Sequence, residues 1–465
     1  MQFWITASLI ALWTAWVTQA ALCVLQAWKL MRRLEKEPHG DHWGTYGPLP
    51  RCWLLVPFKG ADDDLPACLR SLCTQQYPDY RLRLLVESPA DPAYAVLQTE
   101  LASYPHCDAQ IMVTGVADEH ESQKVHNQIA ALRQLDGQAD DADYWVFADS
   151  DAVPGPQWLR SLAGPLIDPD NGMTTSYRWL VPGRVEGGKG RVESEESNSG
   201  SAAAPPRSSA SSHPPRSTLH APPTIWSQLA SVMNSSAACV YRGPLTSLAW
   251  GGAMAVPVRV ARAGGLIDAL RGSFTDDLAI SGMVRRMGKR VWFVSHCLAP
   301  SAVDFGLVDL AAFARRQYMI VREFEPLRYI GPIIVFTLWV LGFVTAWLAL
   351  LLAAARGASP WVWGWPLAAI VTVAVCNQLR AGYRRRVVRL ALGDPMAQHL
   401  RIALLLDRWC TPVWMTLHWG LMMLSLFGNR VRWRGVRYRI DGPHEVTRIS
   451  EKSKVSDKPP NASRT

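Results

Sequence analysis

Long stretches without any charged residue constrain this sequence more than its other features. Residues 3–28 contain no charged side chain, and uncharged apolar stretches recur at 329–355 and 357–379. About 20 apolar residues in a helix cross the roughly 30 Å hydrocarbon core of a bilayer, so each stretch is long enough to span a membrane. The sequence therefore predicts an N-terminal transmembrane helix at 1–28 and further membrane helices within 329–428.

A fourth apolar stretch, at 402–427, is interrupted by polar residues and proline. Asp407 and Arg408 lie near its start and Pro412 follows them, so we expect the segment to be broken or re-entrant. A single crossing here would place the basic cluster that follows it on the side opposite the earlier clusters. A re-entrant segment removes that conflict.

Basic residues follow the apolar stretches, and such residues mark the cytoplasmic side of a membrane. This pattern predicts a retained anchor rather than a cleaved signal peptide, because a signal peptide carries its basic residues before the apolar run. It also predicts a multi-pass membrane protein with its central region in the cytoplasm. The basic residues are Lys29, Arg32, Arg33 and Lys36 after the first stretch, Arg384, Arg385, Arg386 and Arg389 after the third, and Arg430, Arg432, Arg434 and Arg437 after the fourth.

The net charge of +9 does not indicate a nucleic-acid partner. The arginine clusters flank apolar stretches and no nucleic-acid-binding motif accompanies them, so anionic lipid headgroups explain them better. The nine cysteines include no Cys-x-x-Cys pair, so neither a zinc site nor a disulfide framework is indicated.

The region between the first two membrane stretches, 48–304, has the rhythm of an α/β domain. Short apolar runs alternate with segments of helical periodicity, of which 65–75 is the clearest, with four apolar residues on one face. This alternation predicts a sheet covered by helices. The apolar runs read as buried strands are 53–58, 82–87, 110–114 and 144–148.

Two segments have a composition that cannot form a core. Residues 187–223 are rich in Ser, Pro, Gly and Ala, and residues 445–465 are polar and charged. Such segments bury too little apolar surface to offset their ordering entropy, so we expect a disordered insertion and a disordered tail. Just after the insertion, apolar residues including Trp226 share one helical face, which fits either a core helix or an interfacial helix under the lipid headgroups.

Asp149-Ser150-Asp151 directly follows the apolar run at 144–148. Two carboxylates at the carboxyl end of a strand supply hard oxygen ligands at the edge of a sheet where ligands generally bind. The pair can hold Mg²⁺ or Mn²⁺ against a diphosphate, although acidic pairs also often begin ordinary loops. We expect Asp149 and Asp151 to be metal ligands, with Asp149 also contacting the substrate.

A second acidic motif, Thr275-Asp276-Asp277, precedes a run of helical periodicity. A carboxylate here can remove a proton from an attacking hydroxyl, and Asp276 and Asp277 are the catalytic candidates. The alternative is a helix N-cap, for which Thr and Asp are both favoured.

A third motif, Arg315-Arg316-Gln317, lies in the segment 305–328 just before the second membrane stretch. Arginine forks bind pyrophosphate and glutamine orients hydroxyl groups, which makes these three residues substrate-binding candidates. Basic residues at such a position also anchor membrane helices without any catalytic role.

In their order along the chain, the three motifs resemble family 2 glycosyltransferases with the GT-A fold, and more narrowly the ceramide glucosyltransferase-like branch. Further matching segments are Val56-Pro57-Phe58-Lys59-Gly60, Gln75-Gln76-Tyr77-Pro78, Val86-Glu87-Ser88, Asp91-Pro92-Ala93, Lys124 with Asn127, and Trp433-Arg434-Gly435 with Tyr438. The resemblance covers most of 48–329, and the arrangement of anchor, domain and membrane helices extends it over nearly the whole chain.

The resemblance implies a transfer of a sugar, with UDP-glucose the leading donor and a lipid such as ceramide the acceptor. It implies that Asp277 is the base and that nucleotide contacts come from Pro57, Lys59, Glu87, Asp91 and Lys124. The chain departs from the family pattern in three places: Glu87 stands where Asp is usual, Asp276 replaces the Glu of a Glu-Asp pair, and no Trp follows Arg316.

The sequence thus predicts an inverting, metal-dependent hexosyltransferase in the membrane. Two alternatives remain open. A processive polysaccharide synthase would need a continuous membrane channel, and a non-catalytic membrane scaffold would keep the fold without the chemistry.

Overall fold

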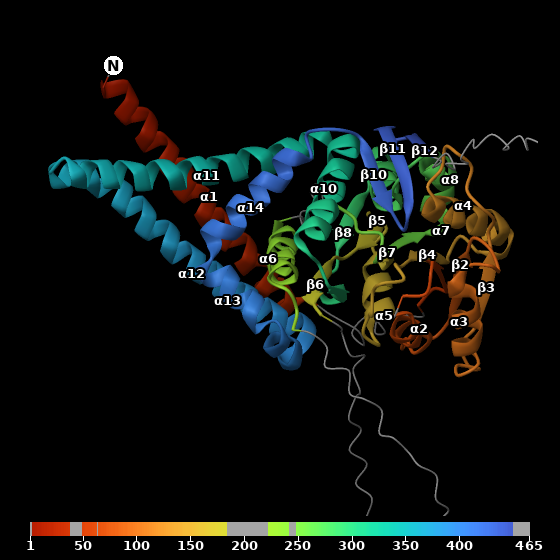
Figure 1. The fold of residues 1–465 in the computed structure, drawn as a ribbon. Coiled ribbons are helices and arrows are strands. Elements are labelled where there is room, and N and C mark those ends of the chain that lie inside the picture. The colour runs from red at the N-terminus through yellow and green to blue at the C-terminus, as the bar shows by residue number, and fades with distance from the viewer. Residues whose placement is uncertain (1, 38–48, 63, 184–221, 241–247, 450–465) are drawn as a thin grey trace, which may run out of the picture.

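The computed structural model describes residues 2–37, 49–62, 64–183, 222–240 and 248–449. An α/β domain lies on one side of the molecule, and a group of long helices extends from it on the other (Figure 1). The predicted fold class is confirmed, since a mixed α/β sheet domain stands between apolar helices in the sequence. Most of the predicted insertion 187–223 lies outside the described residues.

A seven-stranded mixed sheet forms the centre of the domain, in the order β3-β2-β1-β4-β7-β5-β8. The first four strands are parallel, and β7 runs antiparallel between β4 and β5. Each predicted strand is present within two residues of its expected bounds. The strands are β1 (Cys52–Pro57), β2 (Tyr80–Val86), β3 (Ala109–Val113), β4 (Tyr144–Phe147), β5 (Asn171–Thr175), β7 (Met254–Pro257) and β8 (Arg290–Phe293), and β6 (Arg178–Pro182) pairs with β9 (Ala299–Val303) in a separate two-stranded sheet.

Alternate side chains of β1 enter two different cores, because successive residues of a strand point to opposite faces of its sheet. Leu54 and Val56 pack with one layer of helices, and Trp53 and Leu55 pack with the other. Burial on both faces explains why β1 is a continuous apolar run. The first layer contains α2 (Leu65–Cys73), α3 (Pro92–Leu101) and α5 (Trp158–Ala163), and the second contains α4 (Gln123–Leu135), α7 (Val258–Gly264), α8 (Leu266–Leu270) and α9 (Asp276–Arg286).

Among the residues that the structure describes, three helices are long and apolar enough to cross a membrane. They are α1 (Gln2–Lys36), α11 (Pro326–Ala355) and α12 (Pro360–His399), and they pack against one another, with α11 and α12 forming the hairpin at the far left of Figure 1. The backbone of α12 leaves helical geometry at Gly393 (φ 86°), two residues before Pro395, so its last turns change direction.

The segment 402–427 is broken, as the sequence predicted. It forms α13 (Arg401–Trp409) and α14 (Thr411–Leu424), and at 9 and 14 residues both are shorter than the roughly 20 residues that a bilayer requires. The residues on either side of this segment contact the α/β domain. Before it, the imidazole of His399 forms a hydrogen bond with the carbonyl oxygen of Pro182. After it, the strands that follow α14 pack beside Phe274. The segment therefore leaves the basic residues after it beside the domain.

Two helices join the α/β domain to the long helices. α6 (Ile225–Val240) and α10 (Leu307–Phe324) both place apolar residues in the core that α1, α11 and α14 share, and Trp226 packs at its margin. Both helices therefore fix the domain against the three long helices.

The described part of the chain finishes in a three-stranded antiparallel sheet of β10 (Arg430–Trp433), β11 (Val436–Gly442) and β12 (Glu445–Ile449). The prediction of a disordered tail from residue 445 is wrong for its first five residues. Val446 is buried in a small core with Phe274 and Tyr438, and β12 pairs with β11 along its length, which together order this edge strand. The remaining tail lies outside the described residues.

The packing of α1 on α11 yields a stability prediction. A Cβ added at Gly342 in α11 would lie 2.6 Å from the indole of Trp16 in α1, whereas a Cβ at Gly331 in the same helix meets nothing within 4 Å. Gly342→Ala should lower the stability of the protein in detergent by about 1–3 kcal/mol through overpacking. Gly331→Ala is the matched control and should keep or raise the thermal unfolding temperature, because alanine favours helix. Equal unfolding temperatures in the two variants would contradict this packing.

Candidate active site

A cavity of about 330 Å³ opens at the carboxyl edge of the central sheet, and we call it the edge cavity. The residues after β1 and β4, the start of α4, α10 and the turn between β10 and β11 form its wall. Carboxyl ends of parallel strands are where α/β sheets generally bind ligands. Of the residues proposed from the sequence, its wall contains Pro57, Lys59, Lys124, Asp149, Asp151, Asp277, Arg316 and Gln317.

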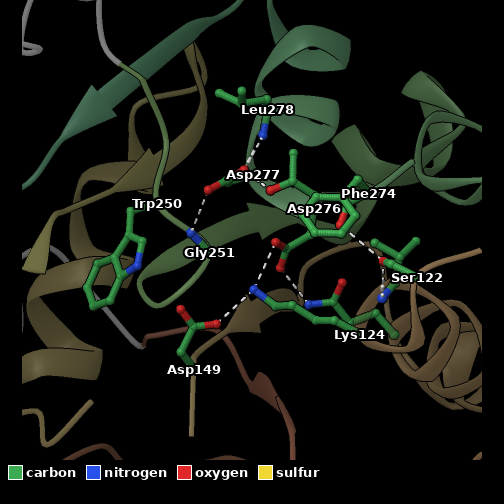
Figure 2. Close-up of polar contacts among 12 residues, drawn as sticks. Ser122, Lys124, Asp149, Trp250, Gly251, Phe274, Asp276, Asp277 and Leu278 are labelled. Carbon is green, nitrogen blue, oxygen red and sulfur yellow. Dashed lines mark hydrogen bonds and ion pairs between the residues drawn. The ribbon is translucent and has the colours of Figure 1, made fainter. Parts of the chain in front are cut away.

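The ammonium of Lys124 lies between two carboxylates that come from distant parts of the chain (Figure 2). Its Nζ donates to Asp149 Oδ1 at 2.7 Å and to Asp276 Oδ1 at 2.9 Å. Asp276 is almost fully buried and also accepts a 2.6 Å hydrogen bond from Gln128. Lys124 thus ties the end of β4 to the start of α9.

Glycine at position 251 is required for this arrangement. A Cβ on Gly251 would lie 2.5 Å from Lys124 Nζ and 2.7 Å from Asp276 Oδ1. The absence of a side chain allows the backbone to approach the ion pair closely, and the Gly251 amide points toward Asp277 (Figure 2).

The two carboxylates of the Asp149-Ser150-Asp151 motif have pKa values shifted in opposite directions. Burial alone would raise the pKa of Asp149, but the adjacent Lys124 outweighs burial and lowers it. Burial and the nearby charge of Asp149 raise the pKa of Asp151, although Arg178 lies 3.6 Å from it. Burial likewise lowers the pKa of Lys124, but Asp149 and Asp276 more than compensate and hold it charged.

Asp277 has the environment of a general base. Its Oδ1 accepts hydrogen bonds from the Thr275 hydroxyl and from the Leu278 amide at 2.7 Å, and its Oδ2 accepts only a long one, 3.3 Å, from the Gly251 amide. Burial and then the charge of Asp276 raise the pKa of Asp277 to about 6. A carboxylate with a pKa close to neutrality is well matched to proton abstraction.

The side chains of this motif do not make the hydrogen bond that a helix N-cap would make. Thr275 occupies the N-cap position of α9 without a capping hydrogen bond, because its hydroxyl donates to Asp277 instead. Asp276 faces the protein interior, and Asp277 faces the edge cavity.

Asp149 and Asp151 fit a hard divalent cation. Both belong to the cavity wall, and the Asp151 side chain is 45% exposed. Mg²⁺ is usually bound through one or two carboxylates plus substrate phosphates and water. Within the described part of the chain no group of three or more acidic, histidine or cysteine side chains is suited to a metal, so phosphate oxygens would have to complete the coordination.

Three arginines line the edge cavity together with these acids: Arg178, Arg316 and Arg434. Arg178 and Arg316 both lie over the ring of Phe313, at 5.2 and 5.7 Å. Burial and the neighbouring charges of Arg178 and Arg434 lower the pKa of Arg316 to about 10. Concentrated guanidinium groups of this kind suit a diphosphate, whose oxygens accept paired hydrogen bonds.

Four residues proposed from the sequence do not line the edge cavity: Asp276, which is buried behind it, and Glu87, Asp91 and Arg315. Glu87 forms a 2.6 Å ion pair with Lys59, and Asp91 caps α3 while accepting from the Gly60 amide at 2.8 Å. Arg315 points to the other side of α10 and donates to the carbonyl oxygens of Phe427 and Arg430. Glu87 and Asp91 thus support the loop after β1, and Arg315 holds the connection from α14 to β10.

Sequence reasoning missed several residues of the cavity wall. Arg178 and Trp250 have no motif around them, and contacts between distant segments bring them to the site: Arg178 lies in β6, which pairs with β9, and the Trp250 amide donates to the Thr175 hydroxyl of β5. Arg434 belongs to a segment that resembled a family signature, but nothing in the sequence placed that segment near Asp149.

A second cavity, of about 430 Å³ and mostly apolar, lies between the domain and the long helices. We call it the apolar cavity. Its wall comes from α1, α6, α10, α11, α12 and α14, and it includes Tyr329 but not Trp226. The residues that line both cavities are Arg178, Trp250, Thr275, Asp277, Gln317 and Ile320.

Comparison with solved structures finds similar chains. Mannosyltransferase PcManGT from Pyrobaculum calidifontis, in complex with GDP-Man and Mn²⁺, matches over 87% of this chain and 99% of its own, with 17% identity and a TM-score of 0.43. Glucosyl-3-phosphoglycerate synthase from Mycobacterium tuberculosis, in complex with Mn²⁺ and UDP-glucose, matches 59% of this chain and 78% of its own, with 16% identity and a TM-score of 0.31.

Sequence comparison finds relatives over part of the chain. A ceramide glucosyltransferase of Candida albicans is 36% identical over 104 residues, which are 20% of this chain and 19% of that protein. One from Komagataella phaffii is 39% identical over 59 residues, 13% of this chain and 12% of that protein. The matches thus span about a fifth or less of these relatives. The model of glycosyl transferase family 21 matches residues 9–186. The predicted resemblance to ceramide glucosyltransferases is confirmed by this match and by the two relatives.

Proposed function

We propose that this protein is a membrane-bound, inverting glycosyltransferase that moves a sugar from a nucleotide sugar to the hydroxyl group of a lipid. The observation that supports this most directly is the meeting of two unlike cavities at Asp277. The edge cavity has carboxylates and arginines suited to a diphosphate, and the apolar cavity suits a hydrocarbon chain. Asp277 belongs to both walls, where donor and acceptor would have to meet.

The proposed reaction is a single displacement. Asp277 Oδ2 accepts the proton of the acceptor hydroxyl as its oxygen attacks the anomeric carbon of the sugar. The bond from that carbon to the diphosphate oxygen breaks, and the nucleoside diphosphate leaves with the bonding electrons. Arg178 and Arg316 would stabilise the negative charge that develops on the departing group.

Lys124 holds this arrangement together and keeps Asp149 ionised. Asp149 and Asp151 would bind Mg²⁺ or Mn²⁺, which when bound neutralises charge on the diphosphate. Lys59, which follows the carboxyl end of β1 and pairs with Glu87, would contact the nucleotide.

UDP-glucose as the donor and a ceramide-like lipid as the acceptor are the specific form of this proposal. The similarity to ceramide glucosyltransferases over 104 and 59 residues supports both, together with the match of residues 9–186 to glycosyl transferase family 21. The apolar cavity opens between helices proposed to cross the membrane, so a lipid would enter it from the bilayer rather than from water.

We further propose that the α/β domain lies on the cytoplasmic side and that α1, α11 and α12 cross the bilayer. The basic ends of α1 and α12 lie together beside the domain: Arg386 pairs with Glu35 at 2.8 Å, and Arg33 lies 5.5 Å over the Trp292 ring. Excess positive charge marks the cytoplasmic side of a membrane protein.

The acceptor is tested with purified protein in lipid nanodiscs, labelled UDP-glucose, Mn²⁺ and ceramide. We expect a single-sugar lipid product that a chelator suppresses. Ala237→Phe, which fills part of the apolar cavity, should lower turnover of the lipid by about tenfold, because its ring occupies space that the acceptor chain would need. Donor binding should stay unchanged. Ala354→Phe, at an exposed position of α11 outside the cavity wall, is the matched control.

The outcome separates the alternatives. A polymeric product would indicate a processive synthase, and binding of nucleotide sugar without any product would indicate a scaffold. Equal losses in the two phenylalanine variants would remove the acceptor role of the apolar cavity.

Asp277 and Asp276 should respond differently to the same substitution. Asp277→Asn removes the base and should lower kcat by about 10² or more, while affinity for the donor stays near that of the wild type. Asp276→Asn leaves the buried ammonium of Lys124 with one carboxylate fewer, so it should lower the unfolding temperature and lower kcat less. Single-turnover rates and thermal unfolding of both variants check this. Full activity in folded Asp277→Asn would leave the mechanism without a base.

Asp151 should act through the metal. Asp151→Asn keeps the shape of the side chain but removes the charge that binds a hard cation, so it should weaken Mn²⁺-dependent binding of the donor. Asp79→Asn is a suitable control, because Asp79 forms an exposed ion pair with Arg51 outside the cavity wall. Titration calorimetry with and without Mn²⁺ measures the effect. A metal dependence identical to that of the wild type would show that Asp151 is part of an ordinary loop.

A further inference from the structure

The turn between β10 and β11 reaches the wall of the edge cavity from the far end of the chain. Trp433 and Arg434 line that cavity together with Asp149 and Asp151, although they follow the last membrane-associated helix. The neighbouring arginines of the wall come from β6 and α10. The C-terminal sheet is therefore a component of the candidate donor site and not an appendage to the membrane helices.

The position of this sheet is fixed by contacts with the segments that carry the proposed chemistry. Tyr438 packs edge-on against Phe274 with ring centroids 5.4 Å apart, just before the Thr275-Asp276-Asp277 motif. The Arg448 amide donates to the Glu119 carbonyl at 2.7 Å, close to the start of α4. Because these contacts hold the sheet against the domain, the turn at its tip keeps a defined place over the edge cavity.

The backbone of the turn is unusual for an arginine. Arg434 has φ of 47° and Gly435 has φ of 81°, so a two-residue turn with both residues in the left-handed region connects the strands. Such turns favour Asn-Gly, and a long side chain at a left-handed position costs of order 1 kcal/mol or more. Arg434 is the only described non-glycine residue with positive φ. Strained residues of this kind cluster at functional sites.

The ion pair of Arg434 is easier for a ligand to replace than the ion pairs of the two lysines at the edge cavity. Lys124 is neutralised by two carboxylates and Lys59 by Glu87. Arg434 instead pairs at 2.5 Å with Asp62, whose side chain is 49% exposed and lies outside the cavity wall. Ion pairs to exposed carboxylates contribute little, about 0–1 kcal/mol, so a ligand with more charge can replace Asp62.

We propose that Arg434 binds the diphosphate of the nucleotide sugar, with its guanidinium leaving Asp62 for the phosphate oxygens when the donor enters. The ligand class is a nucleoside diphosphate or its sugar ester, and the contact adds to those of Arg178 and Arg316. Arg434 therefore places its guanidinium at the cavity wall, whereas Arg315 points away from the cavity. This inference rests on the proposed function.

The experiment compares affinities of full-length protein in nanodiscs for diphosphates and monophosphates of uridine and guanosine in the presence of Mn²⁺. Arg434→Gln should weaken diphosphate binding by about tenfold or more, because a charged hydrogen bond is worth about 1.5–3 kcal/mol. Monophosphate binding should change less than twofold, so the preference for diphosphate falls. Arg434→Lys keeps the charge but loses the fork, and should lie between Arg434→Gln and the wild type.

Two further variants separate binding from structure. Asp62→Asn removes the competing carboxylate and should bind diphosphate at least as tightly as the wild type. Arg439→Gln, in β11 of the same sheet and paired with Asp441, should leave all affinities unchanged. Folding of each variant is followed by thermal unfolding.

The possible failures are distinguishable. If the wild type prefers diphosphate and folded Arg434→Gln keeps that preference, Arg434 is only a structural ion-pair partner and the inference is overturned. An equal loss of diphosphate and monophosphate binding also overturns it. If the wild type binds none of the four nucleotides, the proposed function itself fails and this inference fails with it.

Discussion

The buried ammonium of Lys124 is the interaction on which the site depends. It holds the end of β4 and the start of α9 together through Asp149 and Asp276, and Gly251 leaves room for the contact. A buried charge is tolerated only when it is paired, and removing one partner typically costs about 3–5 kcal/mol. The same contact places Asp277, the next residue after Asp276, at the cavity wall. Stability of the domain and orientation of the candidate base therefore have a common origin.

Asp277 lies where the polar edge cavity meets the apolar cavity, and this position explains its raised pKa. An environment apolar enough to admit a lipid chain also disfavours the charged form of a carboxylate, and burial is the largest cause of its raised pKa. The apolar cavity would thus serve two purposes, since it would accommodate the acceptor and tune the base. The polar edge cavity keeps the opposite character because Lys124 and the arginines offset its acids.

Local patterns predicted much of the fold and part of the site. Buried strands such as β1 and β4 are continuous apolar runs, and Asp149 and Asp277 follow or precede regular elements, so their positions could be read from neighbouring residues. The direction in which a helical side chain points could not be read in this way, and Arg315, a substrate-binding candidate from the sequence, lies outside the edge cavity. Arg178 required knowledge of strand pairing. The edge strand β12 was missed because it depends on pairing with β11 and on the burial of Val446, neither of which its own mostly polar sequence indicates.

The order of the chain adds a consequence for biosynthesis. The central sheet is complete at Phe293, but the turn containing Arg434 emerges from the ribosome only after α10 to α14. Until those helices have been synthesised and packed, one wall of the edge cavity is missing. A nascent or prematurely terminated chain would therefore fold its central sheet without closing the edge cavity. The candidate site is thus completed only after the long helices have been made.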